Sequence, residues 1–173
     1  MEKEIRIQGF DPIIDENSKI LILGTLPGQK SINNNEYYSD TRNQFWKILS
    51  SIFDKDLVIL KYKEKIAFLR ENHIALWDVY ESAERKNSDD KNIRNGKLND
   101  FKGLLKRYPN IEKILVVGDK AQKAFEKYLK INDIQRTLNF ENTKCNYTYL
   151  PSSSGGNPIP KESKIDIWKK AIL

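Results

Sequence analysis

The sequence has little that could hold a metal ion or a covalent cross-link, because it contains one cysteine, Cys145, and one histidine, His73. A single cysteine excludes an internal disulfide, a thiolate zinc site and a four-cysteine iron–sulfur cluster. A single histidine excludes sites that need two imidazole groups. Long apolar runs are also missing: none approaches the ~20 residues of a membrane-spanning helix, and residues 1–10 lack the apolar core of a signal peptide. We therefore expect a cytoplasmic protein without a metal, a cofactor or contact with a membrane.

The composition is that of an ordinary globular protein, with 39% hydrophobic and 31% charged side chains in 173 residues. A chain of this length buries roughly 70% of the surface that its unfolded form exposes, so it needs no disulfide or metal to be stable. No repeat, low-complexity tract or linker divides it. We treat residues 1–173 as a single domain and expect a monomer.

The net charge of +6 is unevenly distributed along the chain. Residues 84–107 hold eight basic and four acidic side chains, an excess of four positive charges. A local basic excess favours a polyanionic partner such as DNA. A helix face in contact with solvent explains the same excess, so charge alone does not decide between them.

Strand and helix patterns alternate along the sequence. Four short apolar runs predict buried strands at residues 20–23, 74–77, 114–117 and 147–150. Helices are expected at about 61–72, 97–108, 119–129 and 160–172, and a further one carries the apolar stripe Phe45, Ile48, Leu49, Ile52 and Phe53, capped by Asp40 or Thr41. This alternation predicts an α/β fold, a three-layer α/β/α sandwich around a central four-stranded parallel sheet. Ligands of such sheets bind beyond the carboxyl ends of the strands.

The loop after the first strand, Gly24-Thr25-Leu26-Pro27-Gly28, brings backbone close to that edge. It is neither a Walker A loop nor a dinucleotide fingerprint, since both spacings are absent. Tyr37 and Tyr38 follow, and then the segment Arg42-Asn43-Gln44-Phe45-Trp46. Aromatic faces can stack a planar base, and an amide can bond its edge.

The segments 24–28 and 42–46 together resemble the uracil-DNA glycosylase superfamily, and most closely its hypoxanthine-DNA (deoxyinosine) glycosylase branch. Three further segments carry the resemblance, which spans about residues 20–160: Leu76-Trp77-Asp78-Val79 with Glu84-Arg85-Lys86, then Val117-Gly118-Asp119-Lys120-Ala121, and Leu150-Pro151-Ser152-Ser153-Ser154-Gly155-Gly156-Asn157-Pro158. The last of these looks like the loop that penetrates DNA in the superfamily.

The resemblance implies a monofunctional glycosylase that hydrolyses the N-glycosidic bond of a flipped deaminated base in DNA and leaves an abasic site. It makes Asn43 the catalytic amide, which places water or bonds the base. Leu26 stands where other branches have a polar or acidic residue, which argues against an efficient uracil enzyme. The implied base-binding residues are Gly24, Thr25, Leu26, Ser31, Tyr38 and Phe45, of which Phe45 also begins the apolar stripe. The implied DNA-binding residues are Arg42, Ser152, Ser153, Ser154, Gly155, Gly156 and Asn157, with Asn157 the candidate to fill the vacated stack.

Other functions stay open at this point. A serine hydrolase is disfavoured because His73 is the sole possible base and no G-x-S-x-G turn surrounds the serines. Asp78, Glu81 and Glu84 are spaced like a nuclease metal cluster, but a solvated turn explains them equally well. A glycosylase for uracil or another deaminated base is an alternative within the enzyme class. A catalytically inactive DNA-binding module of the same fold is the alternative outside it.

Overall fold

The computed structural model describes residues 5–134, 138–140 and 143–173. Its central sheet has the strand order β3-β2-β6-β8-β7. The bounds of these strands are β2 Ile20–Gly24, β3 Ile74–Asp78, β6 Lys113–Val117, β7 Leu138–Phe140 and β8 Thr143–Leu150. Strands β3, β2, β6 and β8 run parallel, as the sequence predicts, and β7 joins the edge of β8 in the antiparallel direction.

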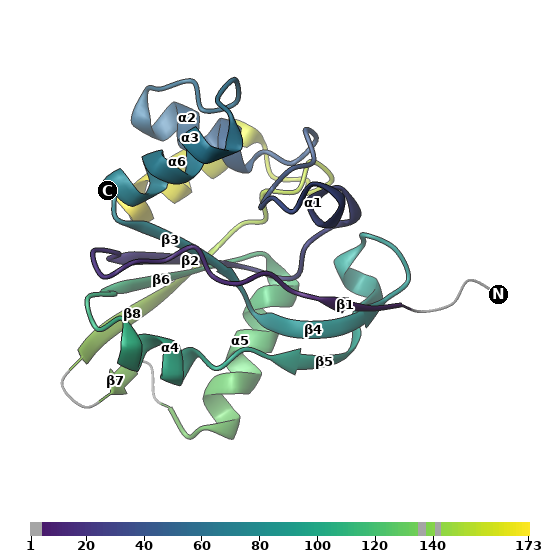
Figure 1. The fold of residues 1–173 in the computed structure, drawn as a ribbon, viewed down its shortest axis with the longest axis vertical. Helices are drawn as coiled ribbons and strands as arrows, with labels where there is room; N and C mark the ends of the chain where they lie inside the picture. The colour runs from purple at the N-terminus through teal and green to yellow at the C-terminus, as the bar shows by residue number, and fades with distance from the viewer. Residues whose placement is uncertain (1–4, 135–137, 141–142) are drawn as a thin grey trace.

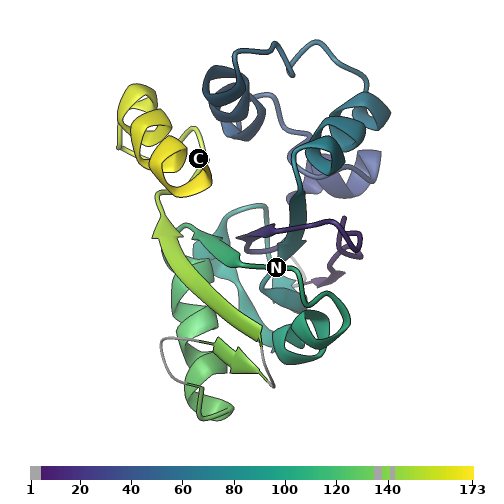
Figure 2. The ribbon, with the colours of Figure 1, turned by 90° about the vertical axis from the view of Figure 1, so that its left-hand side faces the viewer.

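Helices cover both faces of this sheet, which makes the fold a three-layer sandwich (Figure 1). One layer contains α2 (Phe45–Phe53), α3 (Tyr62–Glu71) and α6 (Lys161–Ile172). The opposite layer contains α4 (Phe101–Arg107) and α5 (Asp119–Ile131). Figure 2 shows the yellow helix α6 on one side of the sheet and the green helix α5 on the other.

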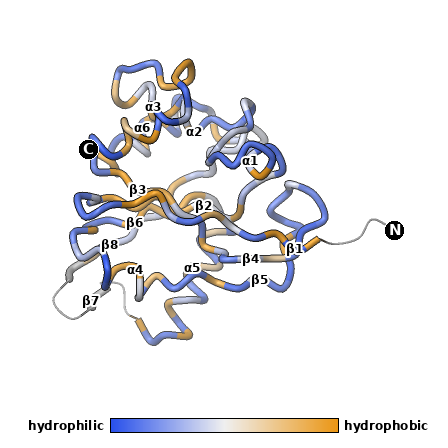
Figure 3. The backbone as a smooth tube through the Cα atoms, in the orientation of Figure 1, coloured by the Kyte–Doolittle hydropathy of each residue, from blue (hydrophilic) through white to orange (hydrophobic). Residues whose placement is uncertain are grey.

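The two-residue period of the buried strands builds a separate core on each face. In β2, Leu21 and Leu23 pack in a cluster with Phe125 of α5, whereas Ile22 packs in a second cluster with Phe45 of α2. Successive strand side chains point to opposite faces, so an unbroken apolar run is needed to fill both cores. Figure 3 shows β2, β3 and β6 as the most apolar stretch at the centre of the molecule.

A second, antiparallel sheet of three strands adjoins the first and was not expected from the sequence. It has the order β1-β4-β5, formed by Ile5–Gln8, Tyr80–Arg85 and Arg94–Leu98. The sequence pattern failed here because β5 is largely exposed and polar. The helix predicted at 97–108 is correspondingly shorter: α4 begins at Phe101, where the Asp100 carboxylate accepts a hydrogen bond from the Gly103 amide.

The prediction that Asp40 or Thr41 caps α2 was also wrong. Asp40 instead pairs with Arg42, and the side chain that reaches the start of the helix belongs to Asn43, whose Oδ1 accepts the Phe45 amide at 2.9 Å. An additional short helix, α1 (Gln29–Asn34), follows the loop after β2, residues 24–28, which we call the glycine loop. Within the described ranges, no helix combines the length and apolar character needed to cross a bilayer.

Candidate active site

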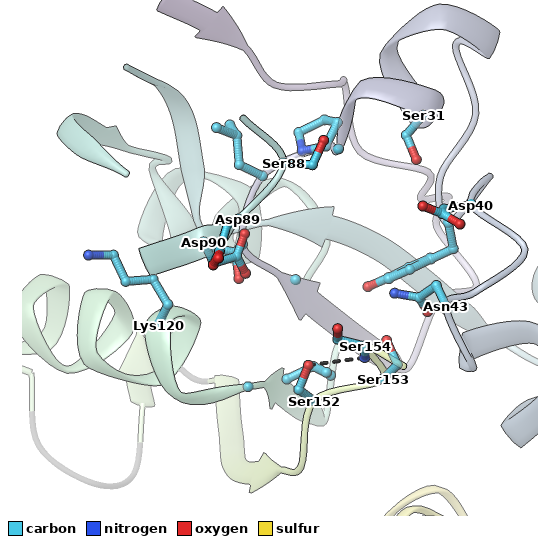
Figure 4. A pocket seen from close by; sticks show the side chains of 18 of the residues that line it. Ser31, Asp40, Asn43, Ser88, Asp89, Asp90, Lys120, Ser152, Ser153 and Ser154 are labelled. Atoms are coloured by element: carbon cyan, nitrogen blue, oxygen red, sulfur yellow. Dashed lines mark hydrogen bonds between the residues drawn. The ribbon is translucent and has the colours of Figure 1, made fainter. Parts of the chain in front are cut away.

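A cavity of about 1540 Å³ opens beyond the carboxyl ends of β2, β6 and β8. Its walls come from the loop after β2, the segment that precedes α2, residues 88–91, the start of α5 and the loop after β8 (Figure 4). This is the sheet edge at which the parallel topology places ligands. The predicted site residues that line it are Gly24, Thr25, Leu26, Ser31, Tyr38, Arg42, Asn43, Ser152, Ser153, Ser154, Gly155, Gly156 and Asn157.

Phe45 lies behind the cavity wall rather than in it. Its side chain is fully buried, and its ring stacks on that of Tyr38 with 3.8 Å between the centroids and 9° between the planes. The ring of Trp168 packs edge-on against Phe45 from α6. Phe45 therefore supports Tyr38 from the core and has no exposed surface of its own.

The carboxamide of Asn43 is held in one orientation by its neighbours. Its Oδ1 accepts the Phe45 amide, and its backbone amide donates to the Asp40 carbonyl oxygen at 2.9 Å. Figure 4 shows the amide nitrogen turned toward the cavity. The arrangement leaves the Nδ2 group of Asn43 as a donor fixed on the cavity wall.

Arg42 carries a charge that its neighbour partly compensates. The guanidinium group contacts the Asp40 carboxylate at 2.8 Å while its side chain stays 79% exposed. Hydrogen bonds from the Arg42 side chain and backbone hold the pKa of Asp40 well below its usual range. Asp40 is thus an anion under ordinary conditions, and it fixes Arg42 at the cavity rim.

Tyr38 and Asp78 close the inner end of the cavity around Gly24. A Cβ atom on Gly24 would lie 2.7 Å from Asp78 Oδ1 and 3.0 Å from the Tyr38 hydroxyl, so a larger residue would force the Asp78 side chain to shift. The Tyr38 hydroxyl is buried without a hydrogen-bond partner among the described residues. Tyr38 itself has a left-handed backbone, with φ at 54°.

Asp78 is the most perturbed acid of the cavity. Burial, followed by the nearby charge of Asp90, raises the pKa of Asp78 to about 7, and Arg85 opposes the shift. A carboxyl group in this state can donate as well as accept a hydrogen bond near neutral pH. Sequence reasoning gave Asp78 no role in base binding, although its place directly after the strand predicted at 74–77 was a usable signal.

Arg85 holds the glycine loop from the protein interior. Its side chain is buried, its Nη2 group donates to the carbonyl oxygen of Pro27, and its Nη1 lies 3.7 Å from Asp90 Oδ1. Burial lowers the pKa of the Arg85 guanidinium, while the surrounding carboxylates favour its charged form. At least one of the basic side chains in residues 84–107 therefore lies in the protein interior and not on a solvated helix face.

The loop after β8, residues 151–158, forms the wall opposite the glycine loop; we call it the serine loop. Within it the Ser152 hydroxyl oxygen accepts the Ser154 amide at 3.1 Å, and the Ser154 hydroxyl oxygen accepts the Gly156 amide at 3.3 Å. The Ser152 and Ser154 hydroxyl groups accept in these two bonds, so the O–H of each can still donate. A Cβ on Gly155 would lie 2.6 Å from the Arg42 carbonyl oxygen, so glycine allows the loop to approach the Asn43 segment.

Three of the residues that the alternative functions require, His73, Glu81 and Glu84, lie outside the cavity lining. His73 bonds the Asn17 carbonyl oxygen and directly precedes β3, at the sheet edge opposite the cavity. Glu81 and Glu84 lie in β4 and pair with Lys97 and Arg6. Over the described ranges, no group of three or more His, Cys, Asp or Glu side chains could hold a metal ion.

Comparisons with known proteins agree with this geometry. A family model described as the Uracil DNA glycosylase superfamily matches residues 12–171. A hypoxanthine DNA glycosylase of Methanosarcina barkeri is 37% identical over 95% of this chain and 97% of the relative, and one of Methanosarcina acetivorans is 35% identical over 94% and 95%. The solution structure of a candidate uracil DNA glycosylase from Methanosarcina acetivorans superimposes with a TM-score of 0.79 at 32% identity, covering 97% of both chains.

Proposed function

Because the chain belongs to the uracil DNA glycosylase superfamily, we propose that it is a DNA-repair enzyme that excises hypoxanthine from deoxyinosine and leaves an abasic site. Two relatives at 35% and 37% identity bear the name hypoxanthine DNA glycosylase, which supports this choice of base. The observation that carries the proposal is the Asn43 carboxamide, fixed by its bond to the Phe45 amide and turned into the cavity. We further propose that the enzyme acts as a monomer. A DNA substrate also fits the expected cytoplasmic location.

In this proposal the flipped base enters the inner end of the cavity. Tyr38 stacks on the base, with Phe45 as its support, since aromatic side chains commonly hold an extruded base in this way. Gly24 lets the base approach the strand end, and the Thr25 and Leu26 amides bond its carbonyl oxygen. Ser31 contacts the base or a neighbouring phosphate.

Asn43 acts on the bond that breaks. An uncharged amide is too weak a base to remove a proton from water at neutral pH, so its role is to place the attacking water or to bond the departing base. The N-glycosidic bond breaks through a cation-like sugar. Negative phosphates of the DNA stabilise that charge from nearby. No covalent bond to the protein is needed, so we propose a monofunctional enzyme.

The serine loop and Arg42 hold the DNA backbone. Hydroxyl groups of Ser152, Ser153 and Ser154 donate to phosphate oxygens, contacts that position the strand without reading its sequence. Arg42 adds positive charge at the rim. Gly155, Gly156 and Asn157 approach the duplex, and Asn157 fills the gap that the flipped nucleotide leaves.

The proposal is tested with duplexes that carry one deoxyinosine, deoxyuridine or deoxyxanthosine. Free base is quantified by chromatography, and abasic sites are cleaved with alkali. Release of hypoxanthine in preference to the other bases supports the proposal, and release of uracil alone replaces it with a uracil enzyme. Salt-sensitive DNA binding without any released base identifies an inactive binding module. A covalent adduct trapped by borohydride would refute the monofunctional mechanism.

A further inference from the structure

Lys164 is a fully buried lysine that the proposed chemistry does not use. It lies in α6, and its Nζ donates to Gln44 Oε1 at 2.9 Å and to the Ser154 carbonyl oxygen at 3.2 Å. Both acceptors are uncharged. Among the residues that the structure describes, no Asp or Glu carboxylate pairs with this ammonium group.

A buried ammonium group without an anionic partner is costly to keep. Removing the charge from water is unfavourable, and burial accordingly lowers the pKa of Lys164. An apolar side chain of similar length would fill the same space without that cost. The two hydrogen bonds offset part of the penalty, so their partners indicate what the lysine does.

Those partners belong to two of the segments that surround the cavity. Gln44 directly follows Asn43, and Ser154 lies in the serine loop. The backbone amide of Gln44 also donates to the Ser153 carbonyl oxygen at 2.7 Å, next to the bond from Lys164. Lower in α6, the Trp168 indole donates to the Pro151 carbonyl oxygen at 3.1 Å. Helix α6 therefore fastens the serine loop at two points and joins it to the Asn43 segment at one of them.

We propose that Lys164 is a positioning residue for base excision, which fixes the serine loop against Gln44 and thereby sets where the DNA strand lies relative to the Asn43 carboxamide. The inference rests on the proposed function. A strand held by the serine loop must present its sugar to Asn43, and a misplacement of about 1 Å can slow an enzymatic step by ~100-fold. The lysine touches neither the base nor the sugar and acts only through these two neighbours.

The test is the single-turnover rate of hypoxanthine release at saturating enzyme, measured for Lys164→Met. Methionine fills the space of the lysine stem but donates no hydrogen bond. We expect at least a tenfold lower rate, at a temperature where circular dichroism shows the variant fully folded, and a dissociation constant for undamaged duplex within threefold of the parent. Lys169→Met, on the exposed side of the same helix, is the matched control and should keep the parent rate.

Gln44→Leu removes the other end of the link and gives a second route if Lys164→Met does not fold. We expect it to slow release at least fivefold, and we expect the double variant to be no more than threefold slower than Lys164→Met. Losses that multiply would show that the two residues act independently, which overturns the proposal. A parent-like rate in folded Lys164→Met, or in Gln44→Leu when Lys164→Met does not fold, also overturns it.

The activity of the unmodified protein distinguishes failure of the proposed function from failure of the role proposed for Lys164. If it releases no hypoxanthine from deoxyinosine, the proposed function fails. If it releases hypoxanthine and the folded variants match it, only the role of Lys164 fails.

Discussion

The backbone amide of Gln44 donates a hydrogen bond of 2.7 Å to the carbonyl oxygen of Ser153. This bond joins the start of α2 to the loop after β8, two segments that are far apart in the sequence. It places the Asn43 carboxamide and the serine hydroxyls on the same cavity (Figure 4). The Asn43 segment and the serine loop therefore form one connected unit of the candidate site.

Substitution of Asn43 by alanine should separate catalysis from DNA binding. We expect at least a ~100-fold lower rate of base release, the size of effect seen when a fixed donor at a reacting centre is removed. Affinity for undamaged duplex should change little, because phosphate contacts supply most of it. The measurement is a single-turnover assay on deoxyinosine duplex beside a binding titration.

Asn43 also caps the start of α2, and the stability of Asn43→Asp compared with Asn43→Ala tests this capping role separately from catalysis. Aspartate keeps an oxygen that can accept the Phe45 amide, so its free energy of unfolding should match that of the parent. Alanine lacks this acceptor and should lose ~1 kcal/mol in urea unfolding. Equal stability of all three proteins would remove the capping role.

Two substitutions of Tyr38 should differ sharply. Its hydroxyl has no partner among the described residues, so Tyr38→Phe should leave both stability and base release close to those of the parent. Tyr38→Ala removes the ring that stacks on Phe45 and should weaken capture of the base by about 1–3 kcal/mol, if Tyr38 stacks on the base. The apparent affinity for deoxyinosine duplex checks this, and unchanged affinity in Tyr38→Ala would assign the residue to the core.

Neighbouring glycines of the serine loop should tolerate alanine unequally. Alanine at Gly155 places its Cβ 2.6 Å from the Arg42 carbonyl oxygen and must push the loop away from the Asn43 segment. Alanine at Gly156 meets only the Ser154 hydroxyl oxygen at 3.8 Å, an ordinary contact. We expect Gly155→Ala to slow base release and lower the midpoint of thermal unfolding, and Gly156→Ala to change neither. Equal behaviour of the pair would show that close approach of the loop is unimportant.

Asp78 should make the protein less stable as pH rises. Its pKa is about 7 in the folded protein against 3.8 ordinarily, so between these values the folded state holds a proton that the unfolded state has lost. The free energy of unfolding should therefore fall through this window by up to about 1.4 kcal/mol per pH unit from this group. Asp78→Asn cannot titrate, so its stability relative to the parent should rise from pH 4.5 to pH 7.5 in urea unfolding. A constant difference across that range would refute the assignment.

Sequence reasoning succeeded where the physical signal is local. The runs at 20–23, 74–77 and 114–117 are apolar at every position, because strands buried on both faces need such side chains. The run at 147–150 also lies within a β-strand, but it is less buried than predicted, since Thr148 is exposed and Tyr147 and Tyr149 are half-buried. Parallel strands also bring their following loops to one edge, so the glycine loop and the serine loop could be expected to meet. The resemblance to a known superfamily then supplied the candidate residues.

Only the tertiary structure decided the features that depend on distant partners. Strand β5 is exposed and polar, so its pairing with β4 leaves no apolar pattern in the sequence. Lys164 and Arg85 look like surface cations until the fold buries them beneath the two loops. Asp78 acquires its raised pKa from burial that no short stretch of sequence specifies. Local hydrophobicity in the sequence thus determines the central strands. The charge state and the hydrogen-bond partners of the polar groups are determined by the residues that folding brings next to them.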